Sequence, residues 1–318
     1  MIESFVFIMS LIDYKGNQPL EIIPKHKFHR ANKTQVDKIK ETLNSSIHSL
    51  PCQIYEYDIT QEVDKDTGDK TYKRSYLPPK LWKYWVISFE KYNTEIPDLS
   101  LAASLLKNDL EFGFTVIAEK LNGEKKQFAA VGLPGNTAYS FYYSDFHGIR
   151  STKQITKEEI LSIGDIYYLI KERKDKYSHI AKAFQRWNDL KSLPRSSDML
   201  IIGLFSVIEC LITHKPYLKD SSDSLTHQVK TKLPLLRKHF RRDIDYSNYF
   251  NMANEEKVWK RLYEFRSRIV HGENSNIEGT FKILKNKSTV INFLNECVKL
   301  LLLISLDEPI LVSDLQKC

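Results

Sequence analysis

Residues 262–273, LYEFRSRIVHGE, decide the fold of the second half of the chain. Together with the preceding helical turn, this stretch contains apolar residues at spacings of four, three and four, namely Val258, Leu262, Phe265 and Ile269. This spacing forms one apolar stripe of an α-helix, so we expect a helix with that stripe buried. Gly272 follows at once, where glycine commonly ends a helix in the left-handed conformation.

The polar side chains of this stretch include an arginine and a histidine five residues apart, Arg266 and His271. Two interpretations are open. Cations near the end of a helix stabilise its dipole by about 0.3–1 kcal/mol each, which implies no function. Alternatively, Arg266 binds a phosphate through two N–H groups and His271 transfers a proton, as cleavage of an RNA backbone by its own 2′-hydroxyl requires.

The composition is that of a globular protein with a modest basic excess. The chain has 318 residues, of which 42% are hydrophobic, and a formal net charge of +7. This length accommodates two domains, and the charge suits a polyanionic partner without requiring one. The four cysteines are far apart and form no CxxC pair. We therefore expect no disulfide framework, no metal site and a reducing cytoplasm as the location.

The apolar segments do not predict a membrane protein. The first residues, MIESFVFIMSLI, lack a basic region and a cleavage site, so we expect a strand there. The most apolar runs, residues 199–212 and 300–306, are too short for a membrane span or are interrupted by Glu209 and Lys299.

Residues 1–145 are dominated by strand signals, which predict an α+β domain with a mostly antiparallel sheet. β-Branched and aromatic residues gather in residues 5–12, 53–60, 70–76, 81–91, 112–121, 126–131 and 139–143. Helical spacing predicts helices over residues 34–47 and 99–106. The dipeptide Asn122-Gly123 predicts a tight hairpin turn.

Two features of this first domain could contact nucleic acid, but each has a plainer explanation. The basic residues 25–30, KHKFHR, could touch phosphate, although a solvated loop with several cations is the favoured interpretation. The aromatic residues Trp82, Tyr84, Trp85 and Phe89 could stack on bases, although such residues in a strand more often pack within the sheet. We expect no catalytic constellation in this half.

The sequence period changes near residue 145 from two to about three and a half, which predicts an all-α domain over residues 146–318. Thr156 and Glu159 predict a capping box at the start of its first helix. A break is expected near Gly164, and helical patterning continues to Leu190.

The next helix is expected to form the centre of a bundle, because residues 199–213, MLIIGLFSVIECLIT, are apolar on nearly every side. Ser196, Ser197 or Asp198 can cap it. A carboxylate buried without a partner is costly, so Glu209 is expected to be protonated, exposed at a site or paired with a cation. A structural ion pair and a role in a site both remain open.

A basic helix with a kink at Pro234 is expected over residues 224–240. A last helix is expected over residues 289–305. The outer face of the basic helix is predicted to bind RNA together with Arg268. The predicted RNA-binding residues are Lys230, Lys232, Arg237, Lys238, Arg241, Arg242 and Arg268.

The second half resembles a HEPN domain of the Apea-like kind found in prokaryotic defence proteins. The resemblance covers roughly residues 160–309 and rests on AFQRWNDL, LFSVIECLIT, the basic helix, LYEFRSRIVHG, and an apolar helix followed by EPIL. It implies a metal-independent ribonuclease in which Arg266 holds the scissile phosphate, His271 acts as general base or acid, and Glu209 positions Arg266. Many active members carry Asn, Asp or His after the arginine, whereas Ser267 follows here, as is common in Apea-like members.

The resemblance also implies a dimer in which two copies of the motif meet. On an ideal helix, residues five apart point about 140° from one another and lie about 7.5 Å apart along the axis. One copy therefore directs Arg266 and His271 poorly at a single phosphate. A twofold axis could bring Arg266 of one subunit close to His271 of the partner subunit, so we expect a homodimer.

The sequence thus predicts a β-rich α+β domain followed by an all-α bundle, and the resemblance implies that the HEPN bundle acts as a cofactor-free endoribonuclease of bacterial anti-phage, abortive-infection type. The expected substrate is RNA, with tRNA as a candidate, and a phage-derived trigger or regulatory partner is expected at the first domain. Two alternatives remain open. One is a catalytically silent HEPN module that binds RNA or protein, and the other is a regulatory scaffold for another effector.

Overall fold

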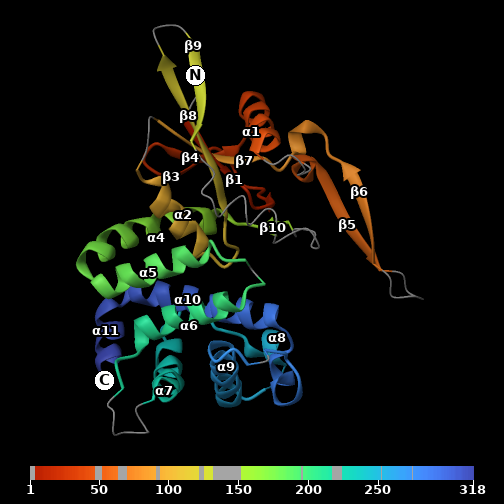
Figure 1. Ribbon diagram of the computed structural model, residues 1–318. Coiled ribbons are helices and arrows are strands. Elements are labelled where there is room, and N and C mark those ends of the chain that lie inside the picture. Colours follow the sequence, from red (N-terminus) through yellow and green to blue (C-terminus); the bar gives the residue numbers. More distant parts are fainter. Residues whose placement is uncertain are drawn as a thin grey trace. The chain divides into compact units, whose positions relative to one another are not determined.

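The computed structural model describes residues 4–46, 52–63, 70–90, 94–121, 125–131, 152–194, 196–216, 224–251, 253–273 and 275–318. The chain forms two compact units, Met1–Tyr167 (unit 1) and Tyr168–Cys318 (unit 2). The expected α+β class is confirmed, because unit 1 contains an antiparallel sheet and unit 2 consists of helices (Figure 1). The expected domain boundary near residue 145 lies outside the described residues.

Unit 1 is built on a six-stranded sheet in the order β3-β4-β7-β1-β8-β9, with antiparallel neighbours throughout. Its strands are β1 (Ser4–Ile8), β3 (Leu20–Ile23), β4 (His26–Arg30), β7 (Trp85–Phe89), β8 (Phe112–Leu121) and β9 (Lys125–Val131). Every residue of β1 and β7 is buried. Strands buried on both faces are expected to be continuously apolar, as these two nearly are.

Helices and smaller strand pairs complete unit 1. They are α1 (Lys33–Ser46), α2 (Ile96–Ser104), the 3₁₀ turns η1 (Cys52–Tyr55) and η2 (Pro79–Leu81), the parallel pair β2 (Ile12–Asp13) and β10 (Lys153–Gln154), and the antiparallel ribbon β5 (Tyr57–Val63) and β6 (Lys70–Tyr76). One apolar cluster joins α1 to the sheet, because Val36 and Ile39 of α1 pack with Phe5 and Phe7 of β1.

The solvated loop predicted for residues 25–30 is wrong, because these residues form β4 between β3 and β7. His26 is buried and stacks on Phe89, with ring centroids 5.9 Å apart. His29 lies 2.7 Å from the Ser88 hydroxyl through its Nε2 atom. Within the strand Lys27 is exposed, His26 is buried and His29 is half-buried, so the polar histidines concealed the alternation of a strand.

Some predictions for unit 1 fall partly outside the described residues. The strand expected at residues 139–143 and the turn residues 122–123 are among them. The strands on either side of that turn, β8 and β9, do pair antiparallel from Thr115 opposite Val131 to Leu121 opposite Lys125, as a hairpin requires. The expected strand at residues 53–60 begins instead with the turn η1 and becomes β5 from Tyr57.

Unit 2 is a bundle arranged around α6 (Asp198–Ile212), which packs against α5, α7, α9, α10 and α11 (Figure 1). The other helical elements are α5 (Ser178–Leu190), α7 (Leu225–Arg237), α8 (Tyr246–Phe250), α9 (Glu255–Val270), η4 (Gly279–Leu284), α10 (Lys287–Asp307) and α11 (Pro309–Lys317). The nearly uniform apolarity of α6 therefore reflects its central position, as expected.

The helix preceding this bundle, α4 (Lys157–Lys176), begins with the predicted capping box. The Thr156 amide donates to Glu159 Oε2 at 3.0 Å, and the Glu159 amide donates to Thr156 Oγ1 at 3.2 Å. The expected break at Gly164 is wrong. A Cβ atom at Gly164 would lie 2.3 Å from the Ile22 carbonyl oxygen, so glycine here allows backbone contact rather than a bend.

Among the candidate caps of α6, the Ser197 side chain accepts the Met199 amide at 3.2 Å. The long helix α10 is the one described helix that is apolar and long enough to cross a membrane, and 78% of its most apolar window is buried within the fold. Burial in the core of a bundle requires the same composition as a membrane span, and it accounts for the apolar character of α10.

Candidate functional site

The candidate site lies on α9, which forms as its sequence predicts. Asn254 caps the helix, with its Oδ1 atom accepting the Lys257 amide at 3.3 Å. Val258, Leu262 and Phe265 are fully buried, whereas Ile269 is only partly buried. The predicted left-handed end is confirmed at Gly272, where φ is +69°. An added Cβ would meet nothing there within 4 Å, so the backbone conformation alone requires glycine.

Arg266 of α9 reaches Glu209 of α6. Its Nη2 atom lies 3.2 Å from Glu209 Oε2, and the two side chains are 27% and 14% exposed. The guanidinium also lies over the Phe205 ring, 5.9 Å from its centroid. Of the three states expected for Glu209, the structure contains the ion pair with a cation.

This pair has unused hydrogen-bonding capacity. Glu209 Oε1, the Tyr263 hydroxyl and Arg266 Nε are buried, and none has a hydrogen-bond partner among the described residues. The Tyr263 ring packs on Phe205 with centroids 4.8 Å apart. Buried polar atoms are hydrogen-bonded in the great majority of cases, so three unsatisfied atoms in one cluster require an explanation.

Burial raises the pKa of Glu209, and the positive charge of Arg266 opposes that rise. The Tyr263 hydroxyl also lowers the pKa of Glu209, although the two groups do not reach full hydrogen-bond geometry. The pKa of Tyr263 is raised by burial and by the negative charge of Glu209. Arg266 is therefore the group that makes a charged carboxylate tolerable at this position.

His271 does not join this cluster. It is the C-terminal cap of α9, and its backbone amide donates to the Ser267 carbonyl at 3.0 Å. Its side chain is exposed and makes no hydrogen bond or ion pair with any residue that the structure describes. Arg266 turns inward to α6 while His271 lies at the exposed helix end, which agrees with the large angular offset expected for residues five apart.

Most predicted RNA-binding cations already have carboxylate partners. Lys230 lies 2.7 Å from Glu256, Arg242 lies 2.8 Å from Glu296, and Arg241 makes two hydrogen bonds of 2.7 and 2.6 Å to Asp307. Arg268 lies 3.8 Å from Glu273 and 4.6 Å from the centroid of the Phe281 ring. Exposed ion pairs contribute at most about 1 kcal/mol, so Lys230 and Arg268, whose carboxylate partners are exposed, can exchange a carboxylate for a phosphate. The Arg242–Glu296 pair is only 22% and 19% exposed and is less available.

The remaining three predicted cations differ in position. Lys238 is exposed and has no ion-pair partner among the described residues. Lys232 is buried, and its ammonium lies 3.2 Å from Gln228 Oε1, so its expected place on the outer face is wrong. Lys232 lies three residues after Val229 and four before Leu236, so helical spacing already places it beside the apolar face of α7, and its charge alone suggested the outer face. Arg237 belongs to an internal network.

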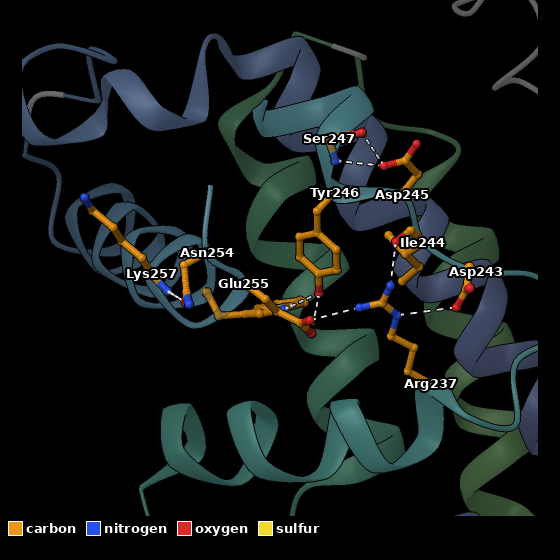
Figure 2. A network of polar contacts seen from close by, with 10 residues as sticks. Arg237, Asp243, Ile244, Asp245, Tyr246, Ser247, Asn254, Glu255 and Lys257 are labelled. Carbon is orange, nitrogen blue, oxygen red and sulfur yellow. Dashed lines mark hydrogen bonds and ion pairs between the residues drawn. The ribbon is translucent and has the colours of Figure 1, made fainter. Parts of the chain in front are cut away.

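Figure 2 shows Arg237 pointing toward Glu255 and Tyr246. The guanidinium donates to Glu255 Oε2 at 3.0 Å and to the Ile244 carbonyl at 3.2 Å. Tyr246 donates to the other oxygen of Glu255 at 2.8 Å, and the Trp259 indole donates to the Tyr246 oxygen at 2.9 Å. Sequence inspection missed this network, because its members come from α7, α8 and α9 and only Glu255 and Trp259 share a helical spacing.

No group of three or more His, Cys, Asp or Glu side chains within the described ranges could hold a metal ion. Comparison of the chain with family models, with curated proteins and with solved structures yields no match. The chemistry of the site therefore has to be inferred from its own residues.

Proposed function

We propose that unit 2 is a metal-independent endoribonuclease of the HEPN type. The observation that carries this proposal is the buried but incompletely hydrogen-bonded Arg266–Glu209 pair, on the helix that ends at an exposed His271. Arg266 supplies a positive charge, and one of its buried N–H donors, at Nε, has no hydrogen-bond partner among the described residues. His271 supplies a group able to transfer a proton near neutral pH.

In the proposed reaction the ribose 2′-oxygen attacks the adjacent phosphorus, and the bond to the 5′-oxygen of the next nucleotide breaks. The histidine accepts the proton of the 2′-hydroxyl or donates a proton to the leaving 5′-oxygen. Arg266 stabilises the negative charge that develops on the phosphate oxygens. The products are a 2′,3′-cyclic phosphate and a 5′-hydroxyl. Glu209 holds the guanidinium in position without touching the RNA.

The active form is proposed to be a homodimer. Within one chain Arg266 faces α6, whereas His271 is exposed at the end of α9. A twofold arrangement of two α9 ends would combine Arg266 of one chain with His271 of the partner subunit at one phosphate. A protein that cleaves RNA while it is purely monomeric would contradict this arrangement.

The biological role that fits this activity is defence in the bacterial cytoplasm, with RNA, including tRNA, as the target. Unit 1 would sense a phage-derived trigger or recruit a partner that releases the nuclease. This role follows from the resemblance to defence-associated HEPN proteins and from the absence of any catalytic cluster recognised in the sequence of the first half.

The decisive experiment is incubation of the purified protein with total bacterial RNA in the presence of EDTA, followed by analysis of the cut ends. We expect discrete products that end in cyclic phosphates. His271→Ala should reduce their formation by at least about 100-fold, as expected for loss of a general acid or base. The matched control is His227→Ala, which removes an exposed histidine of α7 and should leave cleavage intact. Unchanged cleavage by His271→Ala would refute the assignment.

A second candidate function is a catalytically silent module that binds RNA. The observation in its favour is that Arg266 is held against Glu209 and Phe205, away from His271. This candidate predicts RNA binding that weakens steeply with salt and yields no cut products.

A further inference from the structure

The base of the β5–β6 ribbon in unit 1 exposes an aromatic ring. Tyr76 is 57% exposed at the end of β6, directly opposite Tyr57 of β5. The two rings meet edge to face with centroids 5.4 Å apart, and Tyr76 meets Trp82 in the same way at 6.2 Å. Figure 1 shows β5 and β6 as a separate two-stranded ribbon.

Ring contacts connect Tyr76 to the buried core of unit 1 through Trp82. Trp82 contacts Tyr84 at a centroid distance of 6.1 Å, and Tyr84 belongs to the buried cluster that includes Phe7 of β1. The Trp82 indole also donates to the Leu77 carbonyl at 2.9 Å. An exposed tyrosine supported in this way loses little conformational entropy when a ligand covers it.

Two cations without carboxylate partners among the described residues lie near Tyr76 in the chain. Arg74 is two residues before Tyr76 in β6, so both side chains project from the same face of the ribbon. Lys80 lies in η2, directly between β6 and Trp82 in the chain. Both cations are exposed, and neither forms an ion pair with a residue in the described ranges.

The carboxylates of the ribbon base are already neutralised. Glu56 is buried and bonded by Lys40 and by the Tyr84 hydroxyl. Asp58 lies 3.2 Å from Lys83 and projects from the ribbon face opposite Tyr57, because neighbouring strand residues alternate. The face that carries Tyr76 therefore combines an exposed ring with uncompensated positive charge.

We propose that Tyr76, Arg74 and Lys80 form a binding surface for single-stranded RNA. An unpaired base stacks on Tyr76, while the adjacent phosphates contact Arg74 and Lys80, which is the combination that single-strand binding requires. An acidic peptide would satisfy the cations but would leave the ring without a role. The choice of RNA over DNA rests on the proposed function, whereas the stacking surface itself does not.

The test is fluorescence anisotropy with a labelled oligouridylate of about 16 nucleotides, a length within the usual range for single-strand sites. The full chain carries His271→Ala throughout, so that the probe stays intact. Tyr76→Ala should weaken binding at least about fivefold, whereas Tyr76→Phe should retain it, because stacking needs the ring and not the hydroxyl. Arg74→Gln and Lys80→Gln should each reduce the salt dependence by a slope of about 0.7.

Matched controls are Tyr168→Ala, which removes another exposed tyrosine, and Lys27→Gln, which removes an exposed cation of β4. Both should bind the oligouridylate as the parent does, and circular dichroism should show that every variant is folded. The proposal is overturned if Tyr76→Ala binds normally, if the controls lose as much affinity, or if duplex RNA or oligoglutamate competes as well as the single strand.

The binding and cleavage assays separate this surface from the proposed activity. A chain that binds oligouridylate through Tyr76 but never cuts RNA supports the surface and contradicts the nuclease. A chain that cuts RNA through His271 while Tyr76→Ala binds normally supports the nuclease and refutes the surface.

Discussion

Two of the arginine–glutamate pairs that α9 helps to form differ in how completely their hydrogen bonds are used: the N-terminal pair, Arg237–Glu255, and the C-terminal pair, Arg266–Glu209. At the start of α9, Glu255 accepts from Arg237 and from Tyr246, and Arg237 also donates to a backbone carbonyl (Figure 2). Near the end of α9, Arg266 makes one hydrogen bond of 3.2 Å to Glu209, and both residues keep a buried atom without a hydrogen-bond partner among the described residues.

We propose that this difference separates a structural role from a functional one. A fully bonded network fixes one arrangement of helices, because every alternative leaves a buried polar group unpaired. A half-bonded pair keeps donor and acceptor capacity for something that the chain itself does not supply. The N-terminal pair therefore anchors α9, and we propose that the C-terminal pair is the one that receives a phosphate.

The largest expected effect is on catalysis at the C-terminal pair. Arg266→Ala should reduce RNA cleavage by about 100- to 1,000-fold, the usual loss when a group that stabilises developing negative charge is removed. Arg266→Lys should restore little, because lysine lacks the planar fork of donors. The initial rate of cyclic-phosphate formation measures both. Arg237→Ala is the control, and an equal loss of rate in that folded variant would erase the distinction between the pairs.

The next largest effect is on stability at the N-terminal pair. Arg237→Ala should lower the free energy of unfolding by roughly 2 kcal/mol, because it leaves Glu255 and the Ile244 carbonyl with lost hydrogen bonds. Hydrogen exchange of the amides of α7, α8 and α9 reports this change locally. Arg266→Ala should cost less, since it removes one hydrogen bond and Glu209 can take up a proton. An equal cost would identify the C-terminal pair as structural.

The smallest effect concerns pH. Because burial raises the pKa of Glu209 above its value of 4.5 in an unfolded chain, the native protein retains this proton longer. Stability contributed by the protonated form is therefore lost as pH rises through the raised pKa. Glu209→Gln should lack this fall when the free energy of unfolding is measured upward from the unfolded carboxyl pKa, because the glutamine side chain does not titrate. Arg266→Ala should show a larger fall, because no cation then opposes the burial. A fall of the same size in Glu209→Gln would mean that another group titrates.

Much of the fold was predictable because its signals are local. The capping box at Thr156 and Glu159, the cap at Ser197 and the left-handed Gly272 each depend on a few adjacent residues. The errors arose where position in the fold decides the outcome. The basic residues of β4 suggested a loop, whereas pairing with β3 and β7 makes them a strand. Gly164 suggested a helix break, whereas its role is to allow close contact with the Ile22 backbone.

The candidate site divides in the same way. The sequence by itself determined the helix that carries Arg266 and His271, because helical periodicity depends only on residues three and four positions apart in the chain. Only the tertiary structure decided that Arg266 meets Glu209, 57 residues away, and that Glu209 Oε1, Arg266 Nε and the Tyr263 hydroxyl have no hydrogen-bond partner among the described residues. It also decided that Lys232 is buried and that Arg237 is bound to Glu255. Such pairings depend on which helices pack together, and that information is spread over the whole chain.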